Sequence, residues 1–282
     1  MNMEDKQQII KYYDSCEIDY KLIWNLNKSL AMHFGYWDDK TKNFSQALQR
    51  ENEILAEIAK IKRTDTVLDA GCGVGGSAIF LAKKFGCRVT GITLSQNQVN
   101  SAIKNAEENK VNNFTNFKVG NFTKTDFDNN SFDVIWAIES VCHANNREKF
   151  IEEASRILKN GGRLIIADGF ASKTDYDSAW KHLMTSWLNG WCINSLDTKE
   201  DFENSLKKSK FKKISYRNVT KNIMPSSRRL YFYSFPALVF GKIAEILGIR
   251  NKTQTGNIVA AHYQYKATKR NLWEYGIFYA EK

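Results

Sequence analysis

Residues 66–76 read TVLDAGCGVGG, and this stretch decides the fold of the chain. The β-branched and apolar residues at its start predict a short strand that ends where the glycines begin. A helical apolar pattern follows at 77–86. This order of strand, glycine turn and helix brings free backbone N–H groups and the positive end of a helix dipole to one ligand. The turn has the G-x-G-x-x-G spacing of a dinucleotide site. We prefer a ligand-binding turn to a tight turn without a ligand.

The alternation of strand and helix continues on the C-terminal side of the turn. Strand patterns stand at 87–93, 114–119, 131–137 and 163–168, and helical patterns at 95–109 and 147–158, the latter with a glycine cap at 159–162. Strands that alternate with helices at this spacing predict an α/β fold, with a parallel sheet covered on both faces. After residue 168 we expect a helix at 174–206 and two last strands at 211–219 and 273–281.

The ends of two strands decide between the ligands that such a turn can bind. Asp69 ends the first strand, where its carboxylate can accept from a ligand ammonium group and would repel a pyrophosphate. No acid ends the strand at 87–93, although the ribose of a nicotinamide cofactor would need one there. These features disfavour NAD and favour a zwitterionic nucleoside, S-adenosylmethionine (SAM).

At this point the chain resembles the class I SAM-dependent methyltransferases. VLDAGCGVG at 67–75 looks like their motif I, and GITLSQNQ at 91–98 is similar to the subset of tocopherol-type, sterol 24-C and cyclopropane-synthase-like enzymes. Further resemblances lie at 12–14, 33–37, 137–144 and 156–162. The family implies a Rossmann-like doubly wound sheet of about seven strands, the last antiparallel, with a helical N-terminal cap and a helical insertion between the last two strands.

The resemblance also implies how the chain is organised. It predicts one methyltransferase domain over 1–282, with a cap at 1–60, a SAM-binding core at 61–170 and acceptor-side elements at 171–282. A lid over the acceptor is expected at about 222–271. This segment contains the apolar run 230–240, which alternatively forms an ordinary helix packed on the sheet.

The matched motifs imply a set of cofactor contacts. Thr93 and Gln98 match the residues that serve the ribose, and Leu94 matches an adenine-side contact. Asn121 stands where the family commonly has an aspartate that holds the adenine amino group, and its side-chain oxygen can still accept that hydrogen bond. The full predicted set is Tyr13, Tyr36, Trp37, Asp69, Ala70, Gly71, Gly73, Thr93, Leu94, Gln98, Asn121, Phe122 and Ala137. For the aromatic members, plain packing within the cap is an equal alternative.

Glu139 and His143 are the candidates for chemistry. Both follow the strand at 131–137, at the sheet edge where ligands bind in open α/β folds. If the segment is helical, a spacing of four places both side chains on one face. Glu139 would remove a proton or stabilise a cation, and His143 would be its partner or the base itself. The alternatives are a loop-ordering Glu139 and a surface His143, and no metal site is expected.

The charge pattern limits the partners. The 282 residues carry 41 Lys or Arg and 31 Asp or Glu, a net charge of +10. Residues 199–270 hold 16 of the basic and 4 of the acidic residues, so this segment carries the whole excess. It is either a solvated basic face or a surface for an anionic partner, such as a membrane or a polyanion. Nucleic acid is disfavoured, because neither the Asn/Asp-Pro-Pro-aromatic motif of amino methylation nor a basic–aromatic RNA module is present.

The sequence thus predicts a methyltransferase that moves a methyl group from SAM to a small, largely apolar acceptor and releases S-adenosylhomocysteine. An isoprenoid, a prenylated quinol, a sterol-like lipid or a natural product would suit. The alternatives are O- or N-methylation of a small polar metabolite and, behind it, action on nucleic acid. Five scattered Cys without a C-x-x-C pair, and a start without a secretory pattern, predict a cytoplasmic protein, with membrane association left open. The oligomeric state stays open.

Overall fold

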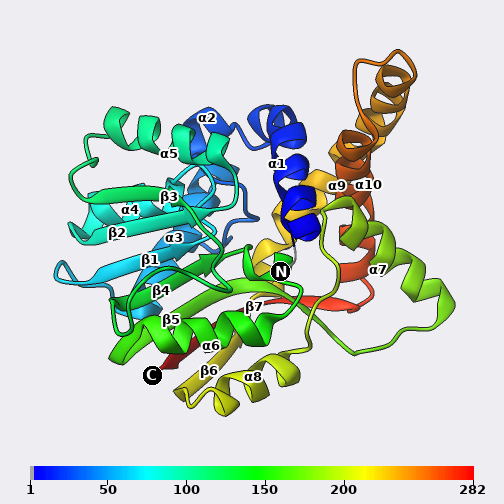
Figure 1. Cartoon of the computed structure of the whole chain (residues 1–282). Helices are drawn as coiled ribbons and strands as arrows, with labels where there is room; N and C mark the ends of the chain where they lie inside the picture. The colour runs from blue at the N-terminus through cyan, green and yellow to red at the C-terminus, as the bar shows by residue number, and fades with distance from the viewer. Residues whose placement is uncertain (1–2) are drawn as a thin grey trace.

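Seven strands form one sheet in the order β3-β2-β1-β4-β5-β7-β6 (Figure 1). The computed structural model describes residues 3–282. The strands are β1 (Thr66–Ala70), β2 (Arg88–Thr93), β3 (Thr115–Val119), β4 (Phe132–Ile138), β5 (Leu158–Ala171), β6 (Lys212–Asn218) and β7 (Trp273–Glu281). β1 to β5 pair in parallel, whereas β7 runs antiparallel to both β5 and β6. The predicted Rossmann-like sheet with an antiparallel last strand is confirmed.

Helices cover both faces of this sheet. α3 (Phe44–Ala59), α4 (Gly76–Phe85) and α5 (Gln96–Glu108) pack on one face, and α6 (Arg147–Ile157) and α8 (Lys199–Lys208) on the other. Successive side chains of β1 point to opposite faces of the sheet. Val67 packs with the first group of helices and Leu68 with the second. A strand buried on both faces needs a continuous apolar run, which is why the TVL and DVIWA runs are strands and not surface loops.

The remaining elements gather at the carboxyl ends of the parallel strands. They are α1 (Met3–Ile23), α2 (Leu26–Ser29), the short 3-10 turn η1 (Val141–His143), α7 (Ser178–Gly190), α9 (Thr220–Ile246) and α10 (Lys252–Thr268). α9 and α10 form a long hairpin between β6 and β7, where the lid was expected, and its tip projects away from the sheet (Figure 1).

α1 is held between the core and this hairpin. At the core side, Asp14 accepts hydrogen bonds from Ser95 Oγ and Asn97 Nδ2, both at 2.9 Å. At the hairpin side, Asp19 forms a two-pronged ion pair with Arg250, with N–O distances of 2.8 and 2.9 Å. The helix therefore bridges two parts of the fold that are far apart in sequence.

Two details of the predicted elements are wrong. The helix expected at 174–206 is two helices, α7 and α8, because residues 191–198 form a connection that lies against β5. The glycines at 161–162 do not cap α6, since Leu158 already has extended geometry and β5 begins there. Gly161 instead donates its N–H to the carbonyl of Lys282, beside the last strand.

Candidate active site

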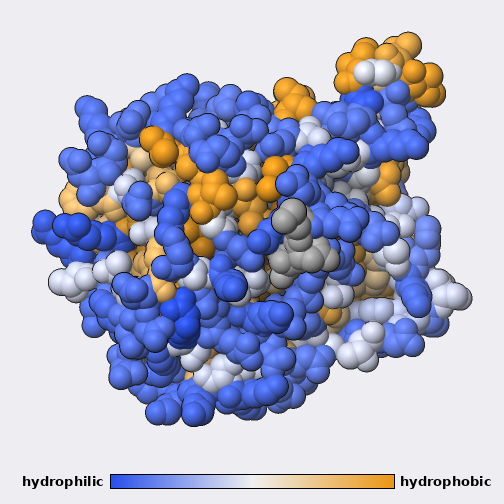
Figure 2. All heavy atoms as spheres, viewed as in Figure 1, coloured by the Kyte–Doolittle hydropathy of each residue, from blue (hydrophilic) through white to orange (hydrophobic). Residues whose placement is uncertain are grey.

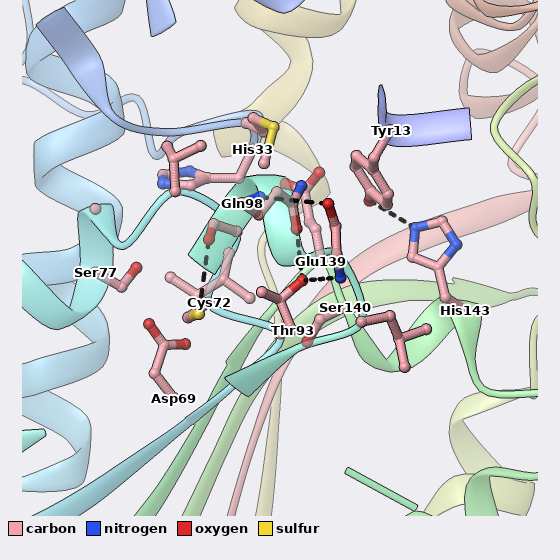
Figure 3. A pocket seen from close by; sticks show the side chains of 18 of the residues that line it. Tyr13, His33, Asp69, Cys72, Ser77, Thr93, Gln98, Glu139, Ser140 and His143 are labelled. Atoms are coloured by element: carbon pink, nitrogen blue, oxygen red, sulfur yellow. Dashed lines mark hydrogen bonds between the residues drawn. The ribbon is translucent and has the colours of Figure 1, made fainter. Parts of the chain in front are cut away.

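The glycine turn at the end of β1 forms the floor of a deep cavity. Gly71 has φ +97°, and a Cβ there would stand 2.3 Å from Cβ of Ser140, so only glycine fits. The turn leads directly into the N-terminus of α4 at Gly76. The resulting space, called here the glycine-loop cavity, measures about 900 Å³. Ten of the predicted site residues line it: Tyr13, Asp69, Gly71, Gly73, Thr93, Leu94, Gln98, Phe122, Glu139 and His143 (Figure 3).

Asp69 lies in the wall of this cavity with one oxygen unused. Its residue is only 3% exposed, and its Oδ2 has no hydrogen-bond partner among residues 3–282. Burial raises the pKa of Asp69 to about 7, although the backbone N–H of Ala78 opposes that rise. A carboxyl group held in this way has capacity for a donor from a bound molecule.

Thr93 and Gln98 meet at the end of β2. Thr93 Oγ1 donates to Gln98 Oε1 across 2.5 Å, and both residues line the cavity. Ser95 caps α5 by accepting from the N–H of Gln98, which fixes the start of that helix beside the strand end. The two side chains predicted from the GITLSQNQ motif therefore stand together, on the same side of the cavity as Leu94.

Tyr36 and Trp37 stand outside the cavity lining. Gly35, with φ +78°, turns the chain toward α3 and α9. Tyr36 hydroxyl accepts from Arg217 at 2.8 Å, and Trp37 Nε1 donates to Ser226 Oγ at 2.7 Å. The structure thus places both side chains in contacts with β6 and α9, away from the glycine-loop cavity.

Asn121, Ala70 and Ala137 also lie outside the lining. Asn121 Oδ1 accepts from the N–H and hydroxyl of Thr123, at 3.1 and 2.9 Å, so its oxygen is turned into its own loop. Ala70 accepts from Ser140 Oγ at 2.6 Å through its carbonyl, which ties β1 to the segment after β4. Ala137 is buried within β4.

Tyr13 and His143 form a hydrogen-bonded pair near the carboxyl end of β4. Tyr13 hydroxyl lies 2.8 Å from His143 Nε2 (Figure 3). His143 Nδ1 lies 3.2 Å from the carbonyl of Cys192. Because a carbonyl only accepts, Nδ1 carries the hydrogen, and Nε2 accepts from the phenol. Burial lowers the pKa of His143 to about 4, so the ring is neutral near pH 7.

Glu139 stands at the centre of the site. The α-helix considered for 139–143 is not present: Glu139 has φ +46°, in the left-handed region, and the 3-10 turn η1 follows. Its Oε1 accepts from the N–H of Phe34 at 2.7 Å and lies 3.0 Å from the hydroxyl of Tyr275. The left-handed backbone turns the strand end, so that Glu139 and His143 line the same cavity without sharing a helix face.

A network behind Glu139 was not foreseen from the sequence. Tyr275 hydroxyl also lies 2.7 Å from Glu51 Oε1, while Glu51 Oε2 accepts from His33 Nδ1 at 2.6 Å and from the N–H of Gly35 at 2.9 Å. Burial, and then the charge of Glu51, raise the pKa of Glu139 well above its usual value. The Tyr275 hydroxyl has one hydrogen, so it can donate to only one of the two carboxylates. If Glu139 holds a proton, Glu139 can donate to the Tyr275 oxygen while Tyr275 donates to Glu51, and both contacts are then hydrogen bonds.

Three residues of this network are also arranged closely enough to hold a metal ion, the one such group among residues 3–282. Ligand atoms of His33, Glu51 and Glu139 lie within 4.8 Å of one another. Four hydrogen bonds from the protein already reach the carboxylates at these distances, two from backbone N–H groups and two from His33 and Tyr275. The donor set therefore suits proton storage better than it suits a cation. No pattern in the sequence links residues 33–35, α3 and β7, so only the tertiary structure reveals this network.

A second cavity begins where Glu139 stands. This space, called here the aromatic cavity, measures about 600 Å³. Nine of its lining residues are aromatic: Tyr12, Tyr13, Tyr20, Trp24, Phe34, Trp187, Trp191, Trp273 and Tyr275. It shares four lining residues with the glycine-loop cavity, namely Tyr13, Met32, Glu139 and His143. The two spaces therefore meet at the candidate catalytic groups.

Known proteins resemble this chain in sequence. A family model described as a methyltransferase domain matches residues 68–166, from β1 to β5. The 27-O-demethylrifamycin SV methyltransferase of Amycolatopsis mediterranei is 34% identical over 168 residues, which cover 60% of each chain. The sarcosine/dimethylglycine N-methyltransferase of Halorhodospira halochloris is 24% identical over 284 residues, covering 96% of this chain and 95% of that protein. The match thus spans only three fifths of the first of these relatives.

Solved structures resemble it in fold. The cyclopropane synthase MmaA2 from Mycobacterium tuberculosis superimposes with a TM-score of 0.82 over 98% of both chains, at 16% sequence identity. This likeness extends over the N-terminal helices and the hairpin as well as the sheet, but at this identity it concerns the fold alone.

Proposed function

We infer the reaction of this chain from one premise: it belongs to the class I SAM-dependent methyltransferases. SAM is the methyl donor of this family. When bound, it supplies an electrophilic methyl group, and the protein aligns an acceptor with that group in a space closed to water. Which residues hold the donor, and which molecule accepts the methyl group, are our proposals.

We propose that the glycine-loop cavity holds SAM. The unpartnered Oδ2 of Asp69 supports this, because a buried carboxylate needs a donor and SAM carries an ammonium group. The hydroxyl and amide of Thr93 and Gln98 suit a ribose diol, and Leu94 and Phe122 offer apolar surface to the purine. Tyr36, Trp37, Ala70, Asn121 and Ala137 are left out of this set, because they do not line the cavity.

The aromatic cavity is the proposed acceptor site, and it is the observation that carries the functional proposal. Nine aromatic residues make a mostly apolar space of about 600 Å³, which suits a small molecule with an apolar body. It meets the glycine-loop cavity at Glu139. An acceptor atom at this junction would be next to both the donor site and the Glu139 carboxylate. We therefore propose methyl transfer to a small, largely apolar acceptor.

Glu139 is the proposed general base. An acceptor hydroxyl, amine or activated carbon gains the methyl group and loses a proton, and Glu139 is the carboxylate in both cavities that can receive it. Because its pKa is raised, the Glu139 carboxylate, once it has lost its proton, is a stronger base than an ordinary glutamate. The hydrogen-bonded Tyr13–His143 pair is proposed to orient the acceptor, since both residues line both cavities beside Glu139.

A second acceptor class has its own support. The match to the sarcosine/dimethylglycine N-methyltransferase covers nearly the whole of both chains. Aromatic faces also hold ammonium groups, so the same cavity would suit a small amine. Nothing in the lining of the two cavities resembles a basic groove for nucleic acid, because neither contains a Lys or Arg.

We propose that the three predicted regions act as one unit. Residues from 1–60, 61–170 and 171–282 line the aromatic cavity together, among them Tyr13, Glu139 and Tyr275. The cytoplasmic placement predicted from the sequence stays a proposal. No helix among residues 3–282 is long and apolar enough to cross a membrane.

The test is methyl transfer into a total extract of the cells from which the chain comes. Purified protein is incubated with the extract and methyl-labelled SAM, and the products are divided between organic solvent and water. We expect the label in the organic phase. Nuclease-resistant label in water would replace the proposal with the small-amine alternative, and nuclease-sensitive label would favour nucleic acid. The Glu139→Gln variant is the matched blank, because it should bind SAM and transfer little label.

A further inference from the structure

The tip of the α9–α10 hairpin exposes an unusual number of large apolar side chains. Six of them lie within eleven positions and are 50–79% exposed: Val239, Phe240, Ile243, Ile246, Leu247 and Ile249. Figure 2 shows the hydrophobic end of the hairpin standing clear of a mostly hydrophilic surface. Single exposed apolar residues are ordinary, but a contiguous convex patch marks a surface that is covered in use.

The charge around this tip is positive. Between Thr220 and Thr268 the sequence has seven Lys or Arg and one acidic residue, Glu245, a balance of +6. Lys242 and Lys252 are exposed. Lys242 lies within the apolar tip, 3.1 Å from Glu245, and Lys252 follows the tip. A second copy of this chain would bring the same positive charge against the patch, whereas an anionic lipid surface would attract it. Apolar side chains with flanking cations are the pattern of interfacial membrane helices.

A groove leads from this tip toward the acceptor site. It measures about 870 Å³ and lies between α1, α9 and α10, with Leu22, Leu230, Phe240 and Ala244 among its lining residues. Trp24 lines both this groove and the aromatic cavity. An apolar molecule that leaves a lipid surface beside the tip would therefore find a lining that is mostly apolar, with Asp19, Arg250 and Asn257 among its polar members.

We propose that the α9–α10 tip inserts into the surface of an anionic lipid bilayer. The six apolar side chains enter the boundary between headgroups and acyl chains, and Lys242 and Lys252 contact lipid phosphates. The hairpin lies on the membrane and does not span it, in keeping with the absence of a spanning helix among residues 3–282. The purpose of the docking, uptake of an apolar acceptor through the groove, rests on the proposed function, whereas the docking itself does not.

The experiment measures binding of the full chain to lipid vesicles. The protein is sedimented with vesicles of phosphatidylcholine, with or without a third of phosphatidylglycerol, at low and high salt. We expect binding to the anionic vesicles that weakens with salt. Ile246→Ser/Ile249→Ser should lower the partition coefficient about tenfold or more, because two of the most exposed side chains lose their apolar contact.

A matched control removes equivalent side chains elsewhere. Ile103→Ser/Phe114→Ser changes two apolar residues that are also exposed but lie on α5 and before β3, and it should leave the partition coefficient within about twofold. Lys242→Gln/Lys252→Gln should weaken the preference for anionic vesicles, because it removes two of the seven basic residues of the hairpin. SAM binding, measured by calorimetry on every variant, verifies the fold and separates a failure of docking from a failure of the proposed reaction.

Three outcomes would overturn the inference. The first is wild-type protein that does not sediment with anionic vesicles. The second is equal binding by the Ile246→Ser/Ile249→Ser variant, which would place the membrane contact elsewhere. The third is a dimer in analytical ultracentrifugation that depends on Ile246 and Ile249, without vesicle binding, because a second copy would then cover the patch.

Discussion

Replacing Glu51 with glutamine should move the pH–rate profile of methyl transfer to lower pH. Glu139 has to lose its proton before it can act as a base, and the nearby negative charge of Glu51 holds that proton in place. The variant removes this charge and keeps the side-chain shape. Its amide would turn its oxygen to His33 and Gly35 and its NH2 to Tyr275, whose hydroxyl hydrogen is then free for Glu139.

The size of the effect follows from the geometry. Ligand atoms of Glu51 and Glu139 lie within 4.8 Å. Two unit charges at about that distance interact with roughly 3.5 kcal/mol at an effective dielectric constant of about 20, and with roughly 0.9 kcal/mol in bulk water. Since about 1.4 kcal/mol corresponds to one pH unit, the ascending limb should move down by about 0.6 to 2.5 pH units. Burial of Glu139 is unchanged, so the limb should stay above the range of an ordinary glutamate.

The assay is kcat/KM for methyl transfer as a function of pH, with the acceptor found by the extract experiment. Glu57→Gln is the matched control, because it removes the same charge from the same helix at an exposed position. Its profile should coincide with that of the wild-type protein. A Glu51→Gln profile that does not move, or that moves to higher pH, would refute the assignment of Glu139 as a base held protonated by its neighbour.

Three further outcomes are expected. Glu139→Gln should leave the Kd for SAM within about threefold and lower kcat by about 10²- to 10⁴-fold, the range for loss of a general base; unchanged turnover would remove Glu139 from the mechanism. SAM binding by calorimetry should tighten as pH rises through about 7, where Asp69 loses its proton, because only the carboxylate attracts the ligand ammonium group. Asp69→Asn should bind about tenfold or more weakly with no such pH dependence, and a pH dependence kept by this variant would belong to another group. Gly71→Ala should abolish SAM binding, since its Cβ would stand 2.3 Å from Ser140 and its φ is +97°; wild-type affinity would mean that the turn is not the binding loop.

Much of the fold follows from local patterns. The runs at 66–69 and 131–137 read as buried strands because both faces of a central parallel strand need apolar side chains. The break between α7 and α8 is not visible in this way. Residues 191–198 contain Trp, Cys, Ile and Leu, and an apolar stretch of this kind suits a helix as well as a connection that packs on β5. Only the position of the neighbouring strand decides between the two.

The candidate site likewise contains residues that local sequence spacing predicts and residues that only the tertiary structure brings together. Asp69 and Thr93 sit at the ends of two neighbouring strands and Gln98 in the first turn of α5, so sequence spacing is enough to bring them to one cavity. Glu51 and Tyr275 meet although 224 residues separate them. Their contact depends on β7 running antiparallel beside β5 and on α3 packing against this end of the sheet, which no local pattern encodes. Tyr36 and Trp37 show the opposite case, since the motif is present but the chain turns at Gly35 and both side chains contact β6 and α9.

The left-handed backbone of Glu139 has a consequence for anyone who would improve this protein. A residue with a Cβ in that conformation costs about 1 to 2 kcal/mol relative to glycine, and asparagine tolerates it better than glutamate. A screen that rewards thermal stability alone would select glycine or asparagine at position 139 wherever this relief outweighs the hydrogen bonds that Glu139 Oε1 accepts from Phe34 and Tyr275. Such variants would keep the sheet and the donor cavity, and they would lack the carboxylate. Stability and turnover are thus set against each other at a single residue, so any selection for robustness has to include activity.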